Sequence, residues 1–194
     1  MNLLPDHWQF FTHIRIIVAM VLGLSMSRII NGLARFIQHP KHYRIYSIHL
    51  GWSFFLILSL IYFWWFEFGL SAIEDWTFEL YFFIIFYAVL FAMISSILFP
   101  DSMEEYAGYE HYFRSRRPWF YGLLALMFLV DVLDTWIKGP VHFNSLGIEY
   151  PIRQAGFFIC SVIAMFVSNK RYQQIFVVVA LVYQTIWILR VFRL

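Results

Sequence analysis

Charged residues are scarce in this sequence. Only 13% of the residues are charged, whereas 61% are hydrophobic and 22% are aromatic. A soluble domain averages about a quarter charged and 45–50% apolar residues. A globule of this size could not hide so much apolar surface, so the composition excludes a soluble globular protein. The formal net charge of +2 is also too small to indicate nucleic-acid binding, and we expect no nucleic-acid partner.

Residues that carry common chemistry are scarce as well. Cys160 is the only cysteine, which excludes an intrachain disulfide and a multi-cysteine metal site. The chain has no Gly-rich phosphate loop, no G-x-S-x-G and no HExxH motif. Of the seven histidines only His49 lies clearly within an apolar run, so two axial histidines cannot face a haem at mid-membrane. We therefore expect no cofactor, no metal and no catalytic residue.

What the sequence does have is long apolar runs separated by short polar segments. Six runs of a length suited to crossing a bilayer can be marked. They are 11–36, 46–70, 76–99, 119–137, 152–167 and 175–191. Period-2 alternation is absent, so the spans must be helices. The predicted fold is an all-α membrane bundle of six transmembrane helices that forms one domain over residues 1–194. The N-terminal stretch lacks a basic n-region, and we expect no cleaved signal peptide.

Lysines and arginines are distributed unequally about these spans. On one side lie Arg35, Lys41, Arg44, Arg114, Arg116, Arg117, Lys170 and Arg171. On the other side lie Arg15, Lys138, Arg153, Arg190 and Arg193. Because basic residues favour the cytoplasmic face, the first, third and fifth loops are predicted in the cytoplasm and both termini outside it. The two arginines nearest the C-terminus oppose this orientation.

Two charged residues lie within the predicted spans at positions where charge is costly. An arginine at a helix centre costs roughly 2.5–3.5 kcal/mol on insertion scales. Arg28 leans outward along the first span and Asp131 leans inward along the fourth, because helical side chains tilt toward their own N-terminus. This geometry predicts that Arg28 and Asp131 form a buried pair if their helices are neighbours.

Further polar residues gather in the outer half of the membrane. Glu67, Asp131 and Asp134 are the acids of this cluster, and Arg15, Arg153 and Arg190 are its bases. Asp134 could pair with Lys138, four residues later on the same helix, or with one of these three arginines from other spans. The cluster has two interpretations. It is a set of ion pairs that fixes the helix register, or it is a polar cavity that binds or conducts an ion, a proton or a small solute.

Small and amide side chains mark further helix faces. Gly23, Ser27 and Asn31 are spaced four residues apart in the first span, which predicts close packing against another helix, with a hydrogen bond from Asn31. Gln154 and Ser161 lie on one face of the fifth span, and Gln184 lies within the sixth. These polar stripes favour hydrogen bonds between helices, with a narrow hydrated path as the alternative.

The segment 100–118 is predicted as a cytoplasmic loop, which could form a short helix on the inner membrane surface. It is acidic first and basic afterwards, with aromatic residues between. Arg114, Arg116 and Arg117 are candidates for contact with anionic lipid headgroups. A solvated loop that only sets the orientation is the simpler interpretation, because three arginines already satisfy the positive-inside rule.

The runs "LGLSMSRIINGLARFIQH", "FWWFEF", "HYFRSRRPWF" and "VDVLDTW" resemble small bacterial polytopic inner-membrane proteins of no characterised family. The resemblance implies a location in the bacterial inner membrane and no particular activity. Two functions remain open. The first is a small transporter or channel subunit with the candidate residues Arg28, Asn31, Glu67, Asp131, Asp134 and Arg153. The second is a non-transporting component that stabilises a partner complex or interacts with lipid. The expected partners are the lipid bilayer and either further copies of the chain or another membrane protein.

Overall fold

The computed structural model describes residues 7–41, 43–73 and 75–191, and over these residues it contains helices and no strand. The helices are α1 (His7–Gln38), α2 (Ser47–Phe66), the 3-10 helix η1 (Glu67–Ala72), α3 (Phe78–Leu98), α4 (Tyr109–Ile137), α5 (Pro140–Ser145), α6 (Glu149–Phe166) and α7 (Lys170–Val191). Arg193, which contributed to the predicted orientation, lies outside the described residues.

Five helical segments are long and apolar enough to cross a membrane. They are Trp8–Gln38, Ser47–Ala72, Phe78–Leu98, Tyr109–Ile137 and Lys170–Val191. The prediction of an all-helical, polytopic membrane protein is therefore confirmed. Helix α6 corresponds to the predicted fifth span but is not one of the five, because Glu149 and Arg153 in its first two turns lower the mean hydropathy of its 18 residues.

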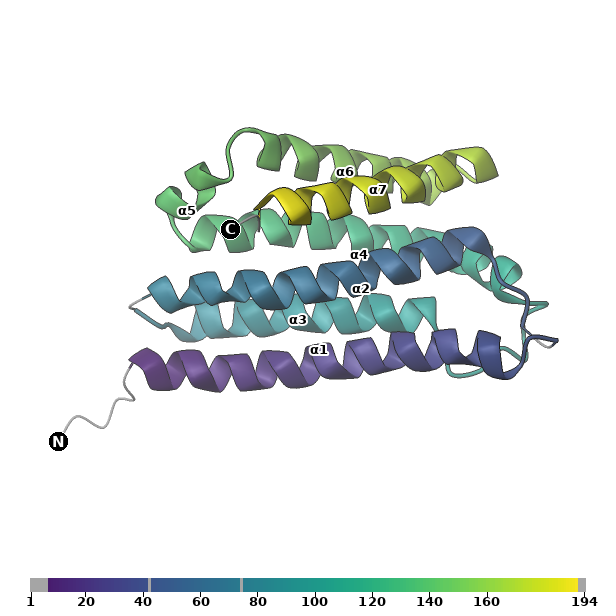
Figure 1. Ribbon diagram of the computed structural model, residues 1–194, viewed down its shortest axis with the longest axis horizontal. Coiled ribbons are helices and arrows are strands. Elements are labelled where there is room, and N and C mark those ends of the chain that lie inside the picture. The colour runs from purple at the N-terminus through teal and green to yellow at the C-terminus, as the bar shows by residue number, and fades with distance from the viewer. Residues whose placement is uncertain (1–6, 42, 74, 192–194) are drawn as a thin grey trace.

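The long helices run side by side along one axis, with α1 beginning and α7 ending at the same end of the bundle (Figure 1). Helix α4 packs against both α3 and α6, and α2 packs mainly against α7. The main neighbour of α1 is α3, with a smaller contact to α2. The first and fourth predicted spans are therefore not close neighbours, although the predicted Arg28–Asp131 pair requires that they are.

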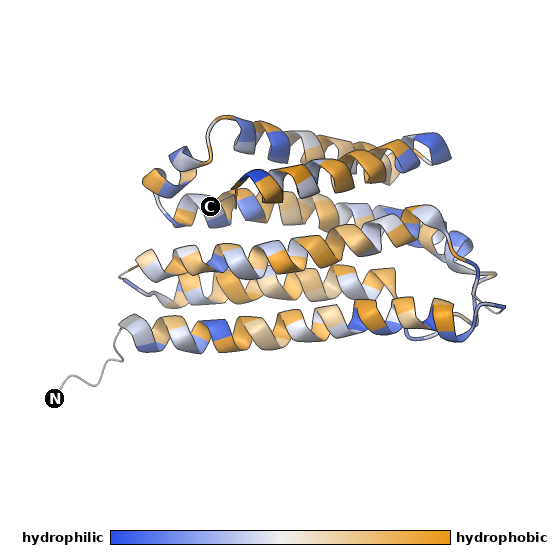
Figure 2. Ribbon diagram, in the orientation of Figure 1, coloured by the Kyte–Doolittle hydropathy of each residue, from blue (hydrophilic) through white to orange (hydrophobic). Residues whose placement is uncertain are grey.

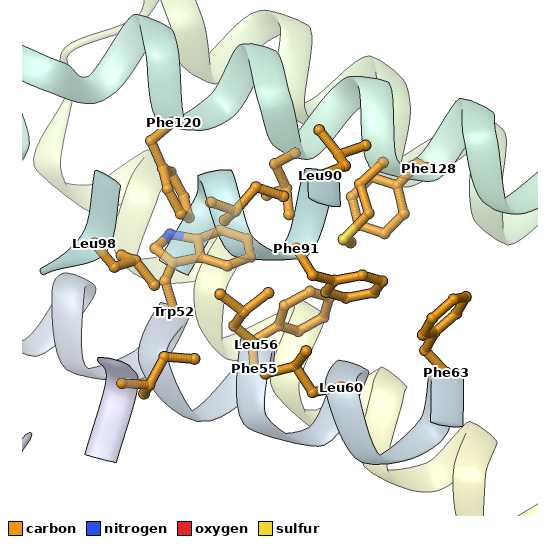
Figure 3. Close-up of a cluster of buried hydrophobic side chains, with 14 of the residues drawn as sticks. Trp52, Phe55, Leu56, Leu60, Phe63, Leu90, Phe91, Leu98, Phe120 and Phe128 are labelled. Carbon is orange, nitrogen blue, oxygen red and sulfur yellow. The ribbon is translucent and has the colours of Figure 1, made fainter. Parts of the chain in front are cut away.

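Aromatic side chains dominate the interior of the bundle. Trp52 is fully buried and stands among Phe55, Phe120 and other large apolar side chains (Figure 3). Its indole N–H donates to the Tyr121 hydroxyl at 3.0 Å, which satisfies the only polar atom of its side chain. At this position the core thus combines dense aromatic packing with a hydrogen bond inside the protein.

The outer surface of the helices is apolar, which is the reverse of a soluble protein. Large hydrophobic residues such as Leu24, Phe82 and Ile175 are exposed on three different helices. Apolar colour covers the middle of the long helices, whereas blue residues are frequent near the connections (Figure 2). On α4, Trp119 and Trp136 are both exposed and lie ~25 Å apart along the helix at 1.5 Å per residue. That spacing is close to the thickness of a hydrocarbon core, about 30 Å.

Two features differ from the predicted helix positions. Helix α4 begins at Tyr109, ten residues before the predicted start of the span, so that the connection from α3 is short. Close packing of α1 occurs at Gly32, where an added Cβ would lie 2.1 Å from the Phe99 ring. The predicted packing face is instead open: Gly23 has no neighbour at its Cβ position, and Ser27 and Asn31 are exposed. Asn31 bonds Ser27 within its own helix at 3.3 Å rather than another helix.

Candidate functional site

Asp131 is buried between α3, α4 and α6 and is 8% exposed. The Tyr87 hydroxyl on α3 donates to Oδ1 at 2.8 Å. From α6, the Tyr150 hydroxyl reaches Oδ2 at 2.7 Å, and the Gln154 amide N–H donates to the same oxygen. Among the described residues no lysine or arginine forms an ion pair with this carboxylate. Three neutral donors therefore hold an acidic side chain in the interior of a membrane protein.

A small cavity adjoins Asp131. Its volume is about 20 Å³, which is room for a single water molecule. The polar residues of its lining come from α2, α3, α4, α6 and α7, and they are Ser59, Tyr62, Tyr87, Asp131, Arg153, Gln154 and Gln184. Because several polar side chains converge there, the cavity suits a water rather than a dry void.

Arg153 stands across this cavity from the acid but bonds elsewhere. Its Nη1 donates to Oε1 of Gln184 at 3.1 Å, and its guanidinium lies 4.4 Å from the centroid of the Trp187 ring. Its buried Nε has no hydrogen-bond partner among the described residues, and neither has Oε1 of Gln154. The cavity thus contains one unengaged donor and one unengaged acceptor, both suited to an ordered water.

A second acidic group lies one turn further along α4, toward its C-terminal end. Lys138 is buried and its ammonium contacts Oε1 of Glu67 at 2.7 Å and also the Asp134 carboxylate. The ammonium lies 4.3 Å from the centroid of the Phe66 ring. Of the alternatives for Asp134, the structure therefore shows the pair with Lys138 along the helix. Glu67, brought in by η1, turns the pair into a triad.

Local backbone features build this triad. Gly69 allows the lysine stem to approach, since an added Cβ there would lie 3.3 Å from Cδ of Lys138. Gly139 has φ +103°, a left-handed conformation that favours glycine, and it reverses the chain after α4. Pro140 then begins α5, which carries His142 over Phe66 with ring centroids 4.9 Å apart. Burial, followed by the nearby Lys138 ammonium, lowers the pKa of His142.

The predicted pair of Arg28 with Asp131 is wrong. Arg28 Nε donates to the carbonyl of Phe99 at 3.0 Å, and its Nη2 meets the Asp101 carboxylate at 2.8 Å. The physical reason is that α3 ends at Leu98, level with Arg28, while α1 continues to Gln38. Arg28 therefore meets the end of a shorter neighbouring helix, and the opposite charge that it needs lies outside the span.

The remaining bases predicted for the cluster are dispersed. Arg15 lies over the Phe68 and Trp64 rings, at 4.2 and 5.0 Å from their centroids. Arg190 pairs with Glu149 across α6 and α7. Only Arg153 of the predicted bases lines the cavity of Asp131. The outer-half cluster is thus divided into an acid with neutral partners, a lysine triad and separate cation sites.

The three arginines of the segment 100–118 lie on the first turns of α4 rather than in an irregular loop. Arg114 is exposed. Arg116 donates to the Tyr106 hydroxyl through Nη2 at 2.7 Å, and Arg117 reaches the carbonyl of Met165 at 3.4 Å. Contact of these residues with lipid headgroups stays a prediction.

Sequence reasoning missed the aromatic members of the Asp131 site. Tyr87 and Tyr150 were indistinguishable from other tyrosines in a chain with 12 of them. A signal was present for Gln154 and Gln184, whose placement in apolar runs predicted hydrogen bonds between helices. Gln154 does bond Asp131 of α4, and Gln184 does accept from Arg153 of α6.

Among the described residues no group of three His, Cys, Asp or Glu side chains is arranged to hold a metal ion. Comparisons with protein-family models, with curated proteins and with solved structures found no match. The class of the protein is therefore defined by its own helices: it is a multi-pass α-helical membrane protein with a divided polar site in its interior.

Proposed function

We propose that the protein is a small transporter or channel subunit of the bacterial inner membrane, and that Asp131 is its proton-binding residue. One observation carries this proposal. Asp131 is buried, has only neutral donors and adjoins a cavity of about one water. Intramembrane acids that lack a cation are costly as charges and commonly mark proton pathways. The cavity is too small for a larger solute, so the proton is the ion that this arrangement suits.

The site has the chemistry for both protonation states. As a carboxylate, Asp131 accepts from Tyr87, Tyr150 and Gln154. As a carboxylic acid it would need an acceptor, and Oε1 of Gln154 is buried without a partner. A turn of this amide about its last bond would present Oε1 to the protonated oxygen, because amide side chains are both donors and acceptors. The tyrosine hydroxyls can likewise reverse their role. Loading and release of a proton then require small side-chain movements.

The proposed topology has six spans, with both termini outside the cytoplasm. Helix α6 lies alongside α4 and α7 and reaches the same end of the bundle as the start of α1 (Figure 1). Its two charges near that end are held by other residues, Glu149 by Arg190 and Arg153 by Gln184. The opposite end carries Arg35, Arg44, Arg114 and Lys170, which supports a cytoplasmic location for that end. In this orientation Asp131 lies in the outer half, ~9 Å before the end of α4.

Proton flux into vesicles tests the proposal. The purified chain is reconstituted into liposomes that contain a pH-sensitive dye, and a potassium diffusion potential drives protons inward. The wild-type protein should acidify the lumen faster than empty liposomes, and Asp131→Asn should abolish the difference at an equal protein content. Glu105→Gln makes the same chemical change at an exposed acid and should leave the flux unchanged. Wild-type flux in Asp131→Asn would refute the assignment.

The alternative is a non-transporting component that stabilises a partner complex or interacts with lipid. The Lys138 triad favours this alternative, because its three buried side chains pair with one another and connect η1 to α4. Under this alternative the wild-type chain conducts no protons, and Asp131→Asn lowers the amount of protein that accumulates in the membrane. The two readouts therefore separate the alternatives.

A further inference from the structure

We propose that a groove between α1 and α3, at the end of the bundle opposite the Asp131 site, binds the phosphate of an anionic phospholipid. The groove has a volume of about 370 Å³, within the range of small-molecule sites. Arg28 and Arg35 are its cationic residues, and Ser27, Asn31 and Ser96 supply hydroxyl and amide donors. This site is independent of the proposed proton pathway.

The two arginines are oriented for a shared anion. They are seven residues apart on one face of α1, ~10 Å along the helix. Backbone carbonyls of the chain leaving α3 hold both of them: Phe99 accepts from Arg28, and Pro100 accepts from Arg35 at 3.3 Å. Guanidinium groups bind phosphate oxygens through pairs of parallel N–H donors, and pre-ordered side chains lose less entropy on binding. The carbonyl bonds thus prepare the groove for a phosphate.

The carboxylate of Asp101 occupies the groove as its anion, and a phosphate could replace it. Asp101 pairs with Arg28 at 2.8 Å, but its side chain is 90% exposed. A solvent-exposed ion pair contributes only about 0–1 kcal/mol. A phosphate bound by both arginines would engage a second cation that Asp101 does not contact. Asp101 therefore acts as a weak competitor of the ligand rather than as a fixed partner.

The surroundings favour a lipid over a free anion. The exposed Asp101 and the end of α3 place the groove at the membrane surface, while α1 extends past it (Figure 1). In the other direction along the same side of α1, Leu24 and Met20 follow at four-residue steps and are 72% and 64% exposed. A lipid whose phosphate lies between the arginines could lay an acyl chain over this apolar strip. A free inorganic phosphate has no acyl chain and would make no contact with the strip.

Lipid binding by the full chain tests the site. Native mass spectrometry measures the dissociation constants of phosphatidylglycerol and phosphatidylcholine for the protein released from detergent. Arg28→Gln and Arg35→Gln should each weaken phosphatidylglycerol binding about tenfold, since a charge-assisted hydrogen bond contributes about 1.5–3 kcal/mol. The double variant should bind both lipids equally. Arg171→Gln removes an exposed positive charge at the start of α7 and should change nothing.

Asp101→Asn gives a readout that misfolding cannot imitate. Removal of the competing carboxylate should tighten phosphatidylglycerol binding several-fold, whereas a purely structural Arg28–Asp101 pair would make the change neutral or harmful. A neutral or harmful effect, or wild-type binding by the double arginine variant, would overturn the proposal. An excess of inorganic phosphate should leave the lipid bound. Displacement at comparable concentrations would show a free-anion site instead and would overturn the lipid assignment.

Discussion

Asp131 and Asp134 are separated by less than one turn of the same helix, and yet their surroundings are chemically different. Asp134 contacts the ammonium of Lys138, which Glu67 shares. Asp131 contacts two hydroxyls and an amide. One carboxylate is thereby paired with a buried cation. Asp131 is held by hydroxyl and amide groups, which can hydrogen-bond either a carboxylate or a carboxylic acid. The comparison shows that two carboxylates on one helix can have partners of different chemistry, a cation for one and neutral donors for the other.

The origin of the partners explains the difference. Asp134 takes its lysine from its own helix, four residues on, where helix geometry alone brings the two together. Asp131 takes its donors from α3 and α6, so its environment exists only after those helices have packed. The Asp134–Lys138 pair depends mainly on local structure, whereas Glu67 of the triad and the donors of the Asp131 site are brought in by tertiary structure.

Removal of the shared cation should be the most damaging change. Lys138→Met leaves Glu67 and Asp134 facing each other without a counter-charge in a buried site. Breaking a buried ion pair on one side typically costs about 3–5 kcal/mol. We expect a marked fall in the thermal unfolding temperature of the protein in detergent. Tryptophan fluorescence monitors the unfolding.

A compensated variant serves as the control for this prediction. The triple variant Lys138→Met, Glu67→Gln and Asp134→Asn removes every charge of the triad and should recover much of the lost stability. If Lys138→Met alone melts like the wild type, the triad does not fasten η1 to α4, and the structural half of the comparison fails.

Neutralising the two aspartates one at a time should change the stability of the protein by different amounts. Asp134→Asn removes a charge-assisted bond to Lys138, and such bonds contribute about 1.5–3 kcal/mol. Asp131→Asn keeps an acceptor oxygen for the tyrosines and removes a charge that no cation balances, so its stability should change by less than about 1 kcal/mol. Melting temperatures of the two variants test this order. A larger loss in Asp131→Asn than in Asp134→Asn would contradict it.

The same division explains how much could be predicted from sequence. The apolar part of α4 and the Asp134–Lys138 pair follow from hydropathy and from four-residue spacing; the span over 119–137 was predicted, and the pair was one of the alternatives for Asp134. The partners of Arg28 and Asp131 depend on which helices are neighbours and where each one ends. Hydropathy gives neither α3 as the main neighbour of α1 nor the end of α3 at the level of Arg28. The predicted pair of Arg28 with Asp131 therefore failed, and Arg28 bonds Phe99 and Asp101 at the end of α3 instead.

Tyr87→Phe should affect the Asp131 site without affecting the triad. The change removes the hydrogen bond to Oδ1 and leaves the ring, which packs against Phe63 with centroids 4.6 Å apart. A single lost hydrogen bond costs about 1 kcal/mol. We expect a small fall in melting temperature and an altered pH dependence of proton flux in liposomes. Tyr81→Phe, a change at a partly buried tyrosine on the same helix, is the matched control. An unaltered flux profile in Tyr87→Phe would show that this hydroxyl takes no part in proton binding.

The smallest expected effect is a dependence of stability on pH at the triad end. His142 has a pKa below its ordinary value near 6.5, because of burial first and the Lys138 ammonium second. Protonation is therefore less favourable in the folded protein than in the unfolded chain. The stability associated with neutral His142 is complete above about pH 6.5 and is lost as the pH falls from there toward the lowered pKa. In His142→Gln, melting temperatures at pH 7.5 and 5.5 should differ less than in the wild type, whereas His111→Gln, at an exposed histidine in α4, should keep the wild-type difference. An equal pH dependence in His142→Gln and the wild type would show that protonation of this histidine does not affect the stability of the triad end.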